Sequence, residues 1–180
     1  MKRRIGPERV LIVDGYNVLN ARRHLDGASA LADARDALIA QLQDYAGFSG
    51  QRIVLVFDAW QGDRQSRSEE DHGRVRVVFT RKGETADHYI ERLCDGFADD
   101  IEARRVEVRV ATSDALEQTI VLGRGATRLS SRELLLEMQQ VRAHGVSRAQ
   151  IASKRSTVAD RIPADVVERM RSMVREGSKD

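Results

Sequence analysis

The sequence has a single cysteine and no long apolar run. Because Cys94 stands alone, the chain can form no internal disulfide and no thiolate zinc cluster, and the residue itself is expected in the core. No stretch approaches the ~18 consecutive apolar residues that span a bilayer. The basic start at 1–9 leads into a short strand-like run and not into a signal sequence. We therefore expect a cytoplasmic protein with no membrane partner.

What the sequence does contain is typical of a highly charged globular protein. Its 180 residues are 41% hydrophobic and 32% charged, which suits one main folded domain and argues against disorder. The net charge of +2 indicates no partner by itself, but the charge is uneven. Arginine outnumbers lysine six to one between 123 and 155, which suits either a solvated face or phosphate binding. The cations of this basic third are Arg124, Arg128, Arg132, Arg142, Arg148, Lys154 and Arg155, against Glu133 and Glu137.

Strand-like and helical patterns alternate along the chain. This alternation predicts an α/β fold, with a mainly parallel sheet of four to five strands covered by helices on both faces. The second half of the charged segment 60–74 has no period and is expected to be a surface loop. The strands are predicted at 10–14, 52–58, 74–80 and 106–114, and the helices at 30–48, 85–97, 115–123 and 130–145.

The C-terminal part is predicted to lie outside the main domain. Ser130 and Glu133 form a capping box that opens the helix ending at Gly145. We expect the main domain at 1–145 and, at 146–180, a basic linker followed by a C-terminal helix that begins near Pro163.

Acidic residues recur where the predicted strands end. Asp14 ends the first strand, Asp58 the second and Asp114 the fourth, while Asp87 falls in the first turn of the helix that Thr85 caps. One strand-ending aspartate is more often a turn or capping residue. Because parallel strands all point the same way, however, we expect these four side chains to meet at one edge of the sheet, where ligands bind in α/β folds.

Such a cluster of carboxylates favours a bound cation. Two carboxylates ~4 Å apart repel by about 4 kcal/mol at an effective dielectric near 20, which demands proton uptake or a counter-ion. Oxygen ligands alone suit Mg²⁺ or Mn²⁺ better than zinc, and such an ion assists phosphodiester hydrolysis. Asn17 either holds Asp14 or a substrate phosphate, or only forms a turn. Glu84 and Glu91 either enlarge the acidic site or are solvated.

Several motifs together resemble the YacP-like branch of the NYN domains, in the PIN-like nuclease superfamily. The resemblance implies a PIN-like three-layer fold for the main domain, a Mg²⁺- or Mn²⁺-dependent endoribonuclease site and a role in bacterial RNA metabolism, including ribosome-associated cleavage of mRNA. It also implies catalytic roles for Asp14, Asp87 and Asp114, with Asn17 assisting, and a metal-binding or bracing role for Asp58. The segments that carry it are LIVDGYNVLN, VLVFDAW, KGETADHYIERL, VRVATSDALEQ and VLGRGATRLSSRELL.

The leading hypothesis is therefore a metal-dependent endoribonuclease that prefers single strands. Arginines of the basic third would bind RNA phosphates, with Arg124 or Arg128 placed by the family motif. Aromatic residues are only 4% of the chain, so base stacking would be limited to Tyr16 and Trp60. A non-catalytic adaptor that binds RNA or the ribosome is the alternative. A haloacid-dehalogenase phosphatase would need a second aspartate where Tyr16 stands, and no G-x-G-x-x-G supports dinucleotide binding.

Overall fold

A computed structural model describes residues 6–22, 28–58, 66–113 and 125–159, and for 28, 29 and 146–159 it describes the backbone alone. The chain divides into two compact units, residues 1–142 and 143–180. Of the second unit, the described part is the continuation of helix α5 (Ser131–Ala159). None of the helices within these described ranges is long and apolar enough to cross a membrane.

The first unit is built on a six-stranded sheet in the order β3-β4-β2-β1-β5-β6. All neighbouring strands are parallel except β3, which runs antiparallel to β4. The predicted α/β fold with a mainly parallel sheet is confirmed, with one strand more than the upper expectation of five. The strands are β1 (Glu8–Asp14), β2 (Arg52–Phe57), β3 (Ser68–His72), β4 (Val75–Phe79), β5 (Val106–Ala111) and β6 (Thr127–Leu129).

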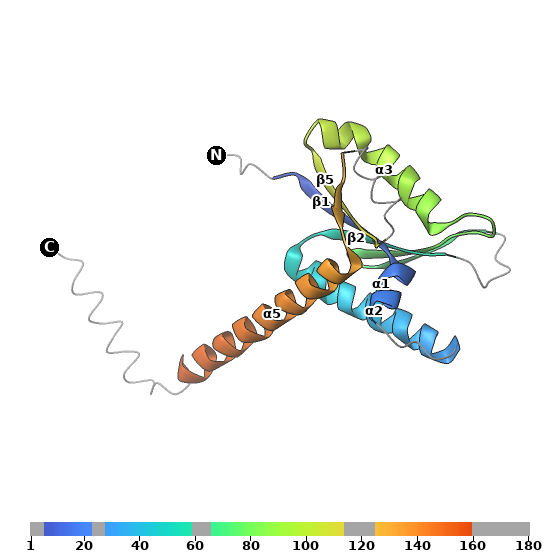
Figure 1. Cartoon of the computed structure of the whole chain (residues 1–180). Helices are drawn as coiled ribbons and strands as arrows, with labels where there is room; N and C mark the ends of the chain where they lie inside the picture. Colours follow the sequence, from blue (N-terminus) through green and yellow to red (C-terminus); the bar gives the residue numbers. More distant parts are fainter. Residues whose placement is uncertain (1–5, 23–27, 59–65, 114–124, 160–180) are drawn as a thin grey trace. The chain divides into compact units, whose positions relative to one another are not determined.

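Helices cover both faces of this sheet (Figure 1). Successive side chains of a strand point to opposite faces, so each apolar strand packs against helices on both sides. Leu11 and Val13 of β1 pack with α1 (Gly15–Ala21), α2 (Ala28–Ser49) and the start of α5. Val10 and Ile12 pack on the opposite face with α3 (Ala86–Glu102), where Cys94 is buried as expected. The central strand is therefore apolar on both faces, which explains the uninterrupted run before Asp14.

The prediction of a surface loop in the second half of the segment 60–74 is wrong. Residues 68–72 form the edge strand β3, which turns into β4 at Gly73, with a φ of 68°. Glu69, Glu70 and Asp71 are exposed, so the strand shows none of the apolar alternation from which strands are predicted. Arg76 on β4 instead forms ion pairs with Glu69 at 3.8 Å and with Asp71 at 3.3 Å.

The prediction that a helix ends at Gly145 is also wrong, because α5 continues to Ala159. A glycine inside a helix costs about 1 kcal/mol relative to alanine, which good helix formers on both sides offset. The capping box at its start is confirmed, since the Ser130 amide donates to Glu133 Oε2 at 2.7 Å and the Glu133 amide to Ser130 Oγ at 3.2 Å. The helices predicted at 115–123 and from Pro163 lie outside the described residues, and the domain boundary at 145/146 stays a prediction.

Candidate active site

Asp14 lies at the carboxyl end of the central strand and is almost fully buried. Its side chain is 5% exposed, and its backbone is in register with Val56 of β2. Asp14 caps helix α1: Oδ1 accepts the Asn17 backbone amide at 3.0 Å, and Oδ2 accepts the Asn17 Nδ2 amide at 2.7 Å. Of the roles that the sequence left open for Asn17, the structure shows the first, because Asn17 binds one carboxylate oxygen with its backbone amide and the other with its side-chain amide.

The Asp14 carboxylate has hydrogen bonds but no cationic partner among the residues that the structure describes. A buried carboxylate is strongly disfavoured unless it is paired with positive charge. An ionised carboxyl group offers about four lone-pair positions, of which Asn17 occupies two. The remaining positions, on oxygens fixed in orientation, fit a hard divalent cation such as Mg²⁺ or Mn²⁺.

Gly15 allows helix α1 to begin directly at this carboxylate. A Cβ atom at Gly15 would lie 2.3 Å from the ring of Phe57, the fully buried last residue of β2. The Tyr16 ring packs edge-on against the same Phe57 ring, with the centroids 5.2 Å apart. Tyr16 therefore packs against the core, and the glycine of the DGYN motif is required by close packing.

Asp58 and Asp87 lie where strand β2 ends and helix α3 begins. Asp58 Oδ2 accepts the backbone amide of Ala86 at 3.4 Å, so Asp58 braces the first residue of α3. Thr85 is the N-cap, as predicted, and its Oγ1 accepts the His88 amide at 3.2 Å. Asp87 is exposed in the first turn of the helix. Both carboxylates therefore belong to the same edge of the sheet as Asp14.

The four aspartates predicted to converge are only partly described. Asp14 ends β1, Asp58 follows β2, and Asp87 follows the loop after β4. These three strands are neighbours in the sheet. Within the described ranges, no three acidic, histidine or cysteine side chains are close enough together to hold an ion. Asp114 lies outside the described residues, immediately after Ser113 at the end of β5. The metal-binding and catalytic roles of these four residues stay predictions.

The predicted RNA-binding arginines are described in part. Arg128 on β6 and Arg132 in the first turn of α5 are exposed. Both acids of the basic third have partners within the chain, because Glu133 caps α5 at the surface and Glu137 forms an ion pair with Arg109 of β5 at 2.7 Å. Of the other predicted residues, Arg124 lies outside the described residues, and Arg148, Lys154 and Arg155 are described by their backbone in α5 alone.

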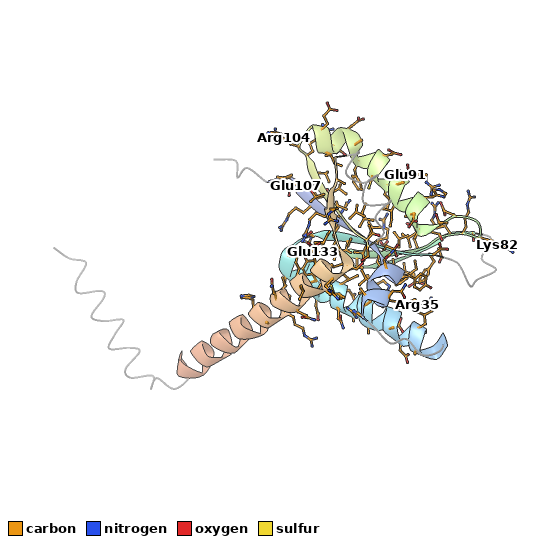
Figure 2. All side chains as sticks on the ribbon, viewed as in Figure 1. Arg35, Lys82, Glu91, Arg104, Glu107 and Glu133 are labelled. Carbon is orange, nitrogen blue, oxygen red and sulfur yellow. The ribbon has the colours of Figure 1, made fainter. Side chains whose placement is uncertain are left out.

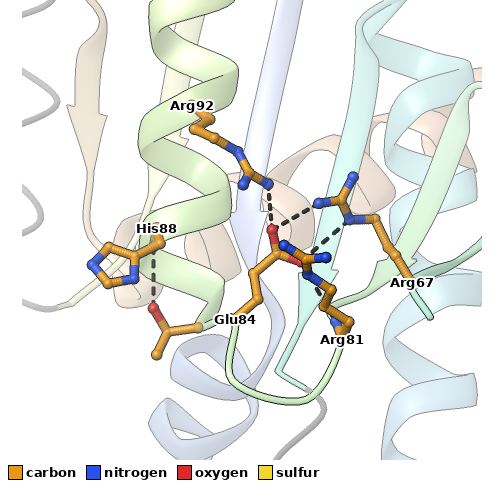
Figure 3. Close-up of polar contacts among 6 residues, drawn as sticks. Arg67, Arg81, Glu84, His88 and Arg92 are labelled. Atoms are coloured by element: carbon orange, nitrogen blue, oxygen red, sulfur yellow. Dashed lines mark hydrogen bonds and ion pairs between the residues drawn. The ribbon is translucent and has the colours of Figure 1, made fainter. Parts of the chain in front are cut away.

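An ion cluster around the buried Glu84, in the loop that leads to Asp87, was missed by sequence reasoning. Glu84 was expected to enlarge the acidic site or to be solvated, and both expectations are wrong. It is 7% exposed and binds Arg67 at 2.7 Å, as well as Arg92, while the Arg81 backbone amide donates to it at 3.5 Å (Figure 3). The partners come from before β3, after β4 and from α3, so no local spacing could have predicted the cluster. It fixes the loop that leads to Asp87.

This cluster yields a prediction about stability. Burial raises the pKa of Glu84, but the hydrogen bonds from Arg67 and Arg92 outweigh it and lower the pKa below the usual 4.5. A carboxyl group with a lowered pKa stabilises the fold at neutral pH, and this contribution is lost as the pH falls through the folded-state pKa. We expect Glu84→Gln to reduce the free energy of unfolding by about 1–3 kcal/mol at pH 7, and by less at a second pH below 4.5, where part of this contribution is lost, measured by urea denaturation.

The control for this measurement is Glu107→Gln, at an exposed position on β5. It should change the free energy of unfolding by less than about 0.5 kcal/mol at either pH. A Glu84→Gln effect that is equally large at both pH values would show that the ion cluster is not its source.

The first unit is an α/β domain with a mainly parallel sheet and with Asp14, Asp58 and Asp87 at one edge, which is the fold that the resemblance to PIN-like domains implied. The sequence model of the YacP-like NYN domain matches residues 11–175, and the chain belongs to this family. The predicted family membership is therefore confirmed.

The relatives found by comparison agree with this assignment. The protein YacP of Bacillus subtilis (strain 168) is 39% identical over 134 residues, which are 73% of this chain and 76% of that protein. The crystal structure of Rae1 (YacP) from Bacillus subtilis is similar with a TM-score of 0.67 and 32% identity, over 93% of this chain and 95% of the other. A crystal structure of a point mutant of Rae1 gives a TM-score of 0.62 and 33% identity, over 86% of each chain.

Proposed function

We propose that the protein is a metal-dependent endoribonuclease that hydrolyses phosphodiester bonds in RNA. The observation that carries this proposal is the buried Asp14 carboxylate, which Asn17 orients and which no described cation neutralises. Membership of a PIN-like nuclease family supports the same reaction class. The family resemblance further supports mRNA on the ribosome, in the cytoplasm of a bacterium, as the substrate.

The acidic residues would act by holding a divalent cation. Asp14 supplies fixed oxygen ligands, and Asp87 and Asp114 complete the proposed catalytic set, with Asp58 bracing or binding from the end of β2. When bound there, Mg²⁺ or Mn²⁺ would stabilise negative charge on the scissile phosphate and favour attack by water. Asn17 contributes by keeping the Asp14 carboxylate in one orientation, so that the site is formed before RNA arrives.

Positively charged residues would hold the RNA at this edge. Arg128 and Arg132 are exposed beside the carboxyl end of β6, two strands from β1 in the sheet. They would bind backbone phosphates in a way that depends on salt and not on sequence. Arg124, Arg148, Lys154 and Arg155 are proposed to bind RNA on the basis of the sequence alone. A buried carboxylate without a neutralising partner does not increase the affinity of a protein for a polyanion such as RNA. The Asp14 site therefore favours a nuclease over a non-catalytic adaptor that only binds RNA or the ribosome.

Removal of the metal tests the proposal directly. We expect purified protein to cleave labelled RNA, either free or in translating ribosomes, when Mn²⁺ or Mg²⁺ is present. EDTA should reduce the rate by at least about 10²-fold, and an excess of Mn²⁺ should restore it. RNA cleavage by gel electrophoresis gives the rate. Cleavage that continues unchanged in EDTA would contradict the metal mechanism, and RNA or ribosome binding without any cleavage would favour the adaptor.

A further inference from the structure

The loop between β4 and α3 borders a hollow with cationic side chains. The hollow has a volume of about 540 Å³ and lies beside the loop that leads to Asp87. Its cations are Arg81, Lys82 and Arg92, with His88 beside them, and its acids are Glu84 and Glu91. Figure 2 shows Lys82 at the tip of this loop and Glu91 on α3.

The three cations of the hollow outnumber its two acids, Glu91 and the buried Glu84, by one. Two guanidinium groups, from Arg67 and Arg92, share the Glu84 carboxylate, so the ion cluster itself keeps one positive charge in excess. The hydrogen bonds between Arg81 and Glu84 use the backbone amide and carbonyl of Arg81, and its side chain is exposed (Figure 3). A guanidinium carries five donors, so Arg92, whose side chain is 54% exposed, retains donors for a ligand.

The two guanidinium groups that bind Glu84, those of Arg67 and Arg92, are also held by an aromatic ring. The guanidinium of Arg67 lies 4.5 Å from the centre of the Tyr89 ring, and that of Arg92 lies 5.5 Å from it. Both groups therefore have a carboxylate and an aromatic ring as partners. A preorganised arginine loses less side-chain entropy on binding a phosphate than a mobile surface lysine does.

The sheet order places this hollow opposite the arginines already proposed to bind RNA. Strand β4 lies two strands from β1 on one side, and β6, with Arg128, lies two strands from β1 on the other. Neighbouring strands are ~4.8 Å apart, so the ends of β4 and β6 each lie ~10 Å along the edge from the end of β1. Since β4, β1 and β6 are all parallel, all three end at the same edge.

We propose that this hollow, lined by Arg81, Lys82 and Arg92, binds a backbone phosphate of the RNA strand next to the one that is cleaved. The strand then crosses the carboxyl edge from the β6 side to the β4 side, over Asp14. This inference rests on the proposed function for its substrate, and it adds a second phosphate site on the opposite side of the acidic residues from the basic third.

Binding measured without metal separates this site from catalysis. The affinity of the protein for a short, unstructured, fluorescently labelled RNA is measured by anisotropy in EDTA, over a range of NaCl concentrations. The test variant carries Arg81→Gln and Lys82→Gln. Its matched control carries Arg52→Gln and Arg74→Gln, which remove the same charge from exposed positions at the starts of β2 and β4, at the opposite edge of the sheet.

One lost phosphate contact should reduce the slope of log K against log salt by about 0.7, which corresponds to a roughly fivefold weaker affinity at 0.1 M salt. We expect this loss in the test variant, and a change of less than about twofold in the control. Equal losses of RNA affinity in both variants would show a net-charge effect and contradict the proposed site. No loss of affinity in either variant would also contradict it. If the wild-type protein binds RNA but does not cleave it with Mn²⁺, only the proposed function fails. If it binds no RNA, both fail.

A chemically altered RNA locates the contact independently of protein folding. A 2′-O-methyl methylphosphonate linkage removes the charge of a single phosphate, and it is moved along the strand on both sides of the cleavage position. In the wild-type protein, one linkage beside that position should weaken binding about fivefold. In the Arg81→Gln and Lys82→Gln variant the same linkage should have no effect, because the partner is already gone. Equal sensitivity in both proteins would overturn the assignment.

Discussion

Asp14→Asn should lower the rate of RNA cleavage by about 10²–10³-fold while the protein stays folded. The substitution keeps the size of the side chain and removes the negative charge that the site offers to a cation. The free energy of unfolding should change by no more than about 1 kcal/mol, because the loss of one acceptor for Asn17 is offset by the removal of a buried charge. The cleavage rate is measured with saturating Mn²⁺, and the free energy of unfolding is measured by urea denaturation.

The matched control is Asp99→Asn, which removes an exposed carboxylate from the far part of α3. It should leave both the cleavage rate and the stability unchanged. An Asp14→Asn variant that cleaves RNA as fast as this control would remove Asp14 from the mechanism. A variant that has lost its fold would be recognised from its urea curve, and Asp14→Glu, which keeps the charge but displaces it, would then decide whether position or charge matters.

Gly15→Ala should reduce the free energy of unfolding by about 3 kcal/mol, and thus lower the melting temperature by roughly 6–12 °C. The added methyl group would lie 2.3 Å from the Phe57 ring, which is fully buried and stacks on Phe79 with the ring centres 5.5 Å apart. Since the ring has no space to move, helix α1 must shift away from β1. Because α1 carries Asn17, we expect the cleavage rate to fall as well.

The same substitution at a different glycine, Gly47→Ala, should have the opposite effect on stability. Nothing lies within 4 Å of a Cβ atom built at Gly47, which is inside helix α2. Alanine should therefore raise the stability by up to about 1 kcal/mol through its higher helix propensity. Thermal unfolding followed by circular dichroism compares the two variants. Equal effects would show that the contact with Phe57 does not determine the requirement for glycine in the DGYN motif.

The sequence predicted those features of the fold that depend on local patterns. The apolar run before Asp14 identified a strand buried on both faces, and capping residues located the starts of α3 and α5. The position of Asp14, Asp58 and Asp87 at one edge followed from the parallel order of the strands. Each of these features arises from residues close together in the chain, or from a rule that holds for every parallel sheet.

Features that depend on contacts between distant residues were not predictable in this way. Strand β3 exists because it pairs with β4, although its own residues are charged. Glu84 is buried because arginines from two other segments reach it. In both cases the local sequence indicates exposure to solvent, and only the three-dimensional arrangement supplies the partner that changes the outcome.

The acidic edge strand also affects how the protein behaves among other chains. An unpaired strand edge offers free amide and carbonyl groups on which a foreign strand can be added, a route to aggregation. Strand β3 is only five residues long and exposes Glu69, Glu70 and Asp71, so an incoming strand would have to approach a row of negative charge. The outer border of the sheet on this side is therefore protected against growth by strand addition.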